Sequence, residues 1–232
     1  MSRMSESCRK SFFLLLVLSF LFGFPPIAYS NNTTLRTPAT GTSKDGAARI
    51  LDALRDDRAA DGAGKTFTAS VNGLLASVSG VLEVTPTEVR VLNEETLRTK
   101  TIFDLKREAS LNPNNDVKVA AQRIIREAGI SLGIKEASLH YFYMARHEGK
   151  WDNFTSPSYN VRTNAFQTMR QIYRAMNEDD AKAFGIELAR SERRYTGQLF
   201  PEYTAMAYAA AIAEGYRGPL FVQGDHFQVD KK

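Results

Sequence analysis

The sequence predicts an α/β protein whose C-terminal third holds a parallel β-sheet. From about Thr155 onward, short apolar runs typical of buried strands alternate with longer segments whose apolar residues recur at helical spacing. Such strand–helix–strand repeats form parallel sheets with right-handed crossovers. With 232 residues and 43% hydrophobic side chains, the chain is long enough to bury the core of one domain or of two small ones.

The chain begins with residues 1–30, a segment typical of a secretory signal peptide. Basic residues precede a nearly unbroken apolar run over 11–24, and the small residues at 28–30 suit a signal peptidase. The run is shorter than the roughly 20 apolar residues that span a membrane, which favours a cleaved signal over an uncleaved anchor. We therefore expect entry into the secretory route and, after cleavage, no stable membrane partner.

Residues 31–44 form a Ser- and Thr-rich segment. This composition suits a disordered linker, and it also suits a transit-like segment that follows a signal peptide. The final compartment therefore stays open between a plastid-type organelle and an extracytoplasmic location.

Residues 45–150 are expected to form a mainly helical N-terminal subdomain with a small β element. Helical spacing of apolar residues dominates this region, but over 78–92 apolar and polar residues alternate as they do in a hairpin. The expected elements are a helix over 45–61, a hairpin with its turn near 85–87, a helix over 116–129 that stops at Gly129, and a helix over 135–147.

Residues 151–232 carry the alternation of strands and helices. The strand candidates lie at 156–161, 183–188 and 219–222. The second of the two helices between them is expected to begin at Pro201 and end at Gly215. The first helix has an apolar side made of Phe166, Met169, Ile172, Tyr173 and Met176.

Polar residues end each strand candidate. The first ends at Asn160 to Arg162, the second carries Glu187 and ends at Arg190 to Glu192, and the third ends at Gln223 to His226. The C-terminal ends of parallel strands share one face of a β/α fold, and ligands bind there. We therefore expect these three polar clusters to converge.

The pair Asp225–His226 is the sharpest element of this pattern. An imidazole at a strand end can bind a divalent metal while the neighbouring carboxylate acts as acid or base on a substrate hydroxyl. The alternative is an Asp that caps a loop beside a His with one ordinary hydrogen bond. Gly224 favours the first interpretation slightly, because a glycine there lets a ligand or backbone approach closely.

Glu187 interrupts an otherwise apolar strand, and a buried carboxylate needs a partner. Arg190 and Arg162 are the candidate partners. A structural ion pair and a substrate-binding acid both fit this pattern.

Composition excludes several classes of protein and site. The net charge of +4 is spread along the chain rather than gathered in a stripe, so we expect no nucleic-acid partner. The single cysteine, Cys8, excludes an intrachain disulfide and a cysteine metal cluster, so any metal must be held by His and carboxylate groups. His140 and His147 are two helical turns apart, too far for a compact ligand pair.

Three segments together resemble a known family. Phe154 to Arg162 resembles the first strand of the class II, metal-dependent fructose-bisphosphate aldolases and their relatives. Gly185 to Glu192 is similar to the second strand of that barrel. Gly218 to Gln228, with its Asp-His pair, is similar to the third.

The resemblance implies a partial (β/α)8 TIM barrel, seen here as its first three strands, and reversible aldol cleavage of a phosphorylated ketose. In this family a divalent metal, usually zinc, polarises the ketone. By position, Asp225 would transfer the proton, His226 would be the first metal ligand, Ser191 would lie near substrate or phosphate, and Asn160 would line the floor of the site. The site candidates of lower rank are Glu187 and Arg190.

The chain also departs from this family. The family uses further metal-binding histidines on later strands, a catalytic zinc takes three protein ligands, and a full barrel needs about 250 residues. We therefore expect a truncated chain that keeps the fold and is inactive alone. The alternatives are a sugar-acid epimerase with the same type of barrel, and a non-catalytic fragment or subunit completed by another polypeptide. A homo-oligomer is also left open.

Overall fold

The computed structural model describes residues 66–150 and 156–227. The chain divides into two compact units, Met1–Asp56 and Asp57–Lys232, and every described residue belongs to the second. The expected signal peptide, the segment over 31–44 and the helix over 45–61 lie outside the described residues. No helix within 66–150 or 156–227 is long and apolar enough to cross a membrane.

The first half of the described chain is mainly helical, as expected. The hairpin predicted within 78–92 is present as an antiparallel pair. Asn114 begins α6 by accepting a hydrogen bond from the Asp116 N–H. The elements are α3 (Val71–Val78), β1 (Leu82–Val84), β2 (Val89–Val91), α4 (Glu94–Thr96), the π-helical turn η1 (Leu97–Thr101), α5 (Ile102–Leu111) and α6 (Asn115–Ser131).

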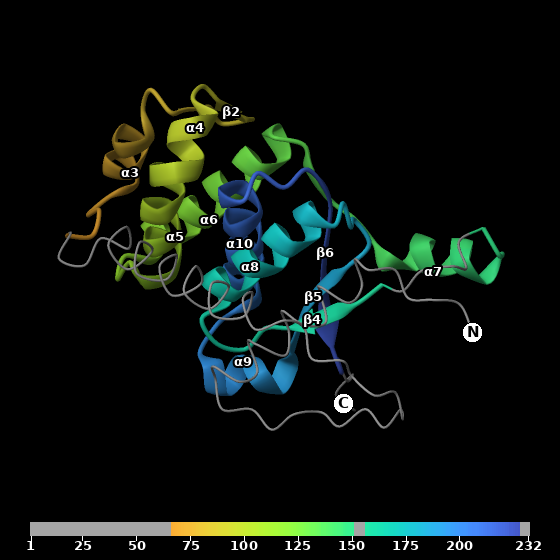
Figure 1. Ribbon diagram of the computed structural model, residues 1–232. Helices are drawn as coiled ribbons and strands as arrows, with labels where there is room; N and C mark the ends of the chain where they lie inside the picture. The colour runs from red at the N-terminus through yellow and green to blue at the C-terminus, as the bar shows by residue number, and fades with distance from the viewer. Residues whose placement is uncertain (1–65, 151–155, 228–232) are drawn as a thin grey trace, which may run out of the picture. The chain divides into compact units, whose positions relative to one another are not determined.

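The predicted alternation of strands and helices is confirmed in the second half. The β4, β5 and β6 strands lie side by side and parallel (Figure 1). Pro201 lies in the first turn of α10, and Gly215 follows its end with a φ of +66°. The elements are β4 (Ser158–Asn160), α8 (Ala165–Glu178), β5 (Gly185–Ala189), α9 (Arg190–Thr196), α10 (Phe200–Ala213) and β6 (Gly218–Asp225).

The sheet gains a fourth strand from the N-terminal half of the chain. Its order is β3-β6-β5-β4, where β3 is Ile134–Glu136. The predicted helix over 135–147 is therefore wrong at its beginning, and α7 starts only at Leu139 and ends at His147. Helical spacing did not reveal β3, because this three-residue strand forms by pairing with Gly218 to Leu220 of β6, more than 80 positions away.

The predicted end of α6 at Gly129 is also wrong. The helix continues to Ser131, and the residue with left-handed backbone is Gly133, at a φ of +85°. Gly129 is buried inside the helix, and a Cβ there would lie 2.4 Å from Cδ1 of Tyr208 in α10. The absence of a side chain at Gly129 allows α6 and α10 to pack closely.

One face of the sheet belongs to the hydrophobic core. Tyr159, Ile186, Leu188 and Leu220 are buried on it, and the alternation of side chains along a strand places their neighbours on the other face. The helix α10 is buried along most of its length and packs against α5, α6 and α8 (Figure 1). The other face carries Glu187, Gln223 and Asp225 beside the buried Phe221 and Ala189, and its polar side chains belong to the candidate site.

Candidate functional site

Asn160 and Asp225 meet at the C-terminal edge of the sheet. The Asn160 amide Nδ2 donates to Oδ2 of Asp225 over 3.2 Å, although β5 lies between their strands. The β5 residue in register with Asp225 is Ala189, whose small side chain leaves room for this contact. Two of the predicted polar clusters thus converge as the parallel sheet requires.

Glu192 is the buried carboxylate of this edge. It lies in the first turn of α9 and is 6% exposed. Its Oε2 accepts a hydrogen bond from the Ala189 backbone N–H over 2.8 Å, and its Oε1 pairs with Nε of Arg162, which follows β4. The second polar cluster is therefore joined to the first through an ion pair.

Burial opposes ionisation of Glu192, but hydrogen bonds outweigh this effect. The Ala189 N–H, the Arg162 guanidinium and the Asn160 amide all stabilise the carboxylate, and together they hold its pKa below the usual value. Glu192 is therefore a buried anion that accepts hydrogen bonds from the Ala189 N–H and from Arg162.

Glu187 has partners other than those expected. Its Oε2 accepts hydrogen bonds from Ser158 Oγ at 2.9 Å and from Gln223 Nε2 at 2.5 Å. The expectation that Arg162 pairs with Glu187 is wrong, because the Arg162 guanidinium pairs with Glu192. The reason is position along the strands: Glu187 is in register with Asn160 and Gln223, two residues before β5 ends, whereas Arg162 follows the end of β4.

Asp225 and His226 contact each other, with 3.2 Å between Oδ1 and Nε2. The Asp225 side chain is 24% exposed and the His226 side chain 83% exposed. His226 has a φ of +49°, a left-handed backbone that residues other than glycine adopt rarely and mostly where surrounding structure imposes it. The strand ends in a conformation that turns the chain sharply at this pair.

The described residues complete no zinc site. Within 66–150 and 156–227, no group of three or more His, Cys, Asp or Glu side chains is placed to hold a metal ion. His140 and His147 are exposed on α7. His226 and Asp225 supply at most two donors, whereas a catalytic zinc takes three protein ligands.

The remaining predicted residues lie on α9 rather than on a strand. Arg190 is half-buried at the first position of this helix, and Ser191 is exposed beside it. Gly224 does allow a close approach, but by the Phe227 ring of the same chain. A Cβ at Gly224 would lie 2.3 Å from this ring, which packs on Phe200 with 5.0 Å between the ring centroids.

Although Glu192 and Gln223 belong to the predicted polar clusters, sequence reasoning assigned no role to Glu192, Ser158 or Gln223. A signal for the last two was present, since they stand two positions before Asn160 and Asp225 and so share their face of the sheet. Glu192 stands three positions after Ala189, where a carboxylate reaches back to the residue that begins the helix.

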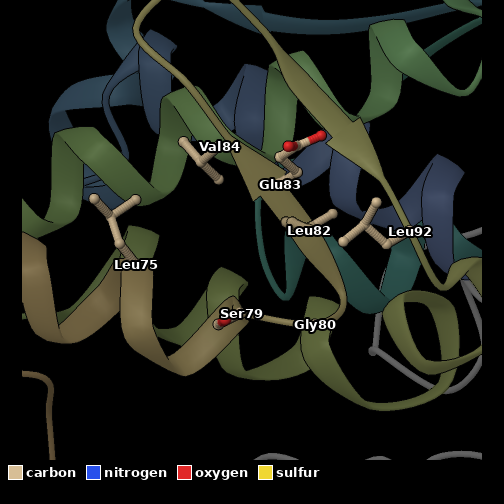
Figure 2. Close-up of a pocket in the computed structure, with 7 residues that line it drawn as sticks. All are labelled: Leu75, Ser79, Gly80, Leu82, Glu83, Val84 and Leu92. Atoms are coloured by element: carbon tan, nitrogen blue, oxygen red, sulfur yellow. The ribbon is translucent and has the colours of Figure 1, made fainter.

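Two hollows lie in the helical half of the described chain. The first, of about 350 Å³, lies between α3 and the β1–β2 hairpin, and its lining includes Leu75, Leu82, Val84 and Leu92 (Figure 2). The second, of about 280 Å³, is lined by α3, η1 and α5 and includes Lys100 and Glu108. None of the predicted site residues lines either of them.

Comparison of the chain with protein-family models finds no match. Comparison with curated proteins and with solved structures finds none either.

Proposed function

We propose that this chain is an aldolase-like protein of the class II, metal-dependent type, and that its parallel sheet is part of a (β/α)8 barrel. The observation that carries the proposal is the hydrogen bond between Asn160 and Asp225. It joins the ends of two strands at the edge where β/α enzymes bind their substrates. The reaction would be reversible aldol cleavage of a phosphorylated ketose.

Asp225 is the residue for proton transfer in this proposal. Its carboxylate is partly exposed, so a substrate hydroxyl can reach it, and the Asn160 amide holds one of its oxygens. A carboxylate in such a position acts as a general base when it lies within hydrogen-bond distance of the proton it removes. Ser191 and Arg190, at the start of α9, are proposed to contact the substrate or its phosphate group, with Glu187 as a candidate of lower rank.

His226 is proposed as one ligand of a divalent metal, with zinc as the first choice. Because the described residues complete no such site, its other ligands must come from outside them. The same observation favours a second candidate, a non-catalytic subunit whose site is completed by another polypeptide.

Metal content of the full chain tests the proposal. We expect stoichiometric zinc, bound tightly by the wild type and lost in His226→Ala. His140→Ala is the matched control, because it removes an exposed imidazole on α7 and should keep the metal. Equal zinc in all three proteins would overturn the role of His226, and zinc absent from the wild type would leave the non-catalytic candidate.

Activity gives the second test. The chain alone is expected to be inactive; if it does bind zinc, the zinc-loaded chain should cleave a phosphorylated ketose, and Asp225→Asn should then lower kcat by about 10²- to 10⁴-fold, the usual contribution of a general acid or base. Cleavage at the wild-type rate in Asp225→Asn would remove that residue from proton transfer.

A further inference from the structure

We propose that Phe227 is a positioning residue that holds the His226 side chain beside Asp225. Its ring does so by packing on the end of β6 and on the start of α10. The inference rests on the proposed function only where it concerns metal binding by His226. The ring contacts and the bend that they close are properties of the described residues, and both are testable without metal or substrate.

Asp225 and His226 are neighbours in the chain, and yet their side chains contact each other. In an extended strand, successive side chains point to opposite faces of the sheet, so adjacent side chains diverge. Here Oδ1 of Asp225 and Nε2 of His226 are only 3.2 Å apart. The end of β6 must therefore leave the extended conformation for both side chains to reach one side of the sheet.

The backbone of His226 makes this change of direction. Its φ of +49° lies in the left-handed region, and the chain bends there directly after the strand. Residues other than glycine adopt this region at a cost, and they keep it only where surrounding structure imposes it. Contacts on either side of His226 must therefore hold the bend.

Gly224 provides the first of these contacts. It is in register with Leu188, which is buried, so Gly224 lies on the core face of the sheet. A Cβ at Gly224 would lie 2.3 Å from the Phe227 ring, and the three heavy atoms nearest to this Cβ all belong to that ring. The ring of a residue three positions later thus fills the place of the missing side chain.

Phe200 provides the second contact. It is the first residue of α10 and packs against the hydrophobic core. Its ring centroid lies 5.0 Å from that of Phe227, with 47° between the ring planes. Aromatic pairs at this spacing are favourable beyond the area that they bury. Phe227 is 52% exposed, but its ring is thereby attached to both a strand and a helix.

The two contacts determine on which side of the sheet His226 lies. If β6 continued as a strand beyond Asp225, the His226 side chain would point to the core face and the Phe227 side chain to the opposite face. The bend reverses this arrangement, because the imidazole contacts Asp225 while the ring contacts Gly224 on the core face. Packing of the ring therefore keeps the imidazole on the side where the proposed site needs a metal ligand.

Proton NMR of the full chain tests the bend. A ring packed on Gly224 shifts the α-protons of this glycine upfield, and a left-handed φ at His226 gives a strong NOE between its own amide and α-protons. We expect Phe227→Ala to lose both signals and Phe227→Tyr, which keeps a ring, to retain them. Tyr143→Ala is the matched control and should retain both, because Tyr143 is an aromatic residue of similar exposure, 54%, on α7.

Gly224→Ala tests the same contact from the strand. It places a methyl group where the Phe227 ring lies, so it should displace the ring and abolish the NOE at His226. An NOE at His226 that persists in Phe227→Ala or in Gly224→Ala would overturn the positioning role. So would a wild-type protein in which this NOE is weak.

Zinc affinity connects the bend to the proposed function. Partners that orient a metal-binding histidine typically change metal affinity about 10- to 100-fold, so Phe227→Ala should weaken zinc binding by at least about tenfold and Phe227→Tyr by less than about twofold. Unchanged zinc affinity in Phe227→Ala would exclude Phe227 from metal binding. A wild-type protein without zinc would remove the proposed function, while the NMR result would still decide the bend.

Discussion

At the scale of single residues, Gly129 allows two helices to pack closely because it has no side chain. It lies inside α6, where the ring of Tyr208 occupies the place of a Cβ. Helix propensity favours alanine over glycine by about 1 kcal/mol, but overpacking a core costs roughly 1–3 kcal/mol. The packing effect should prevail because the clash involves a buried ring.

Gly129→Ala should therefore lower the free energy of unfolding by up to about 2 kcal/mol, the cost of overpacking less the gain in helix propensity. Urea denaturation monitored by circular dichroism measures this change. Ser131→Ala, on the exposed last residue of α6, should stay within about 0.5 kcal/mol of wild type. A more stable Gly129→Ala protein would contradict the packing of Tyr208 against the helix backbone.

Two buried tyrosines differ in what their hydroxyl groups contact. Tyr203 donates to the Glu187 carbonyl oxygen over 2.7 Å, which ties α10 to β5. The Tyr173 hydroxyl is buried and makes no hydrogen bond within the described residues. The two hydroxyl groups should contribute to stability with opposite signs.

Tyr203→Phe should destabilise the protein by about 1–2 kcal/mol, because it leaves a buried carbonyl without its donor. Tyr173→Phe should be neutral or slightly stabilising, because it removes a polar group that burial penalises. Chemical denaturation of both variants gives the comparison. Equal losses in the two would show that ring packing, rather than the hydroxyl group, decides stability at these positions.

At the scale of elements, a buried ion cluster joins α8 to the end of α10. Glu214 follows α10, and its side chain is 9% exposed. It accepts from Nε of Arg170 at 2.6 Å and from Nε of Arg174 at 3.0 Å. The Arg170 guanidinium also lies over the rings of Phe103 and Phe166, which connects the cluster to α5.

Glu214→Ala should cost about 3–5 kcal/mol, because it leaves the buried Arg170 charge without its carboxylate. Glu178→Ala, on the exposed last residue of α8, is the matched control and should cost less than about 1 kcal/mol. Thermal unfolding checks both. A loss below about 1 kcal/mol in Glu214→Ala would mean that the cluster contributes little beyond surface ion pairs.

At the scale of the whole molecule, four buried tyrosines make stability depend on alkaline pH. Burial raises the pKa of Tyr173, Tyr203, Tyr208 and Tyr216, and for Tyr208 the pKa reaches about 12, with a further contribution from the Glu136 carboxylate. A tyrosine in the unfolded chain loses its proton near pH 10. Between these values the folded state binds more protons, so its stability falls as pH rises.

The free energy of unfolding should therefore keep the full tyrosine contribution below about pH 10 and lose it as pH rises through 12. Urea unfolding at pH 8, 10 and 11 follows this loss. Tyr208→Phe removes one of the four groups and should make the pH dependence less steep. A wild-type slope unchanged by this substitution would exclude Tyr208 as a contributor.

Local pattern in the sequence was enough for most elements and for part of the site. The spacing of Phe166, Met169 and Met176 predicted α8, because one apolar side of a helix has to face the core. Parallel strands also predicted that Asn160 and Asp225 would share an edge. These inferences depend on periodicity and topology, which a sequence shows directly.

Tertiary structure alone decided the partners. The strand β3 forms by pairing with β6 far along the chain, so helical spacing nearby carried no sign of it. The pairing of Arg162 with Glu192, rather than with Glu187, depends on where the first turn of α9 places Glu192 beyond the end of β5. The register between distant segments decides which side chains meet, and a shift of one residue would move the side chains of a strand to the opposite face of the sheet.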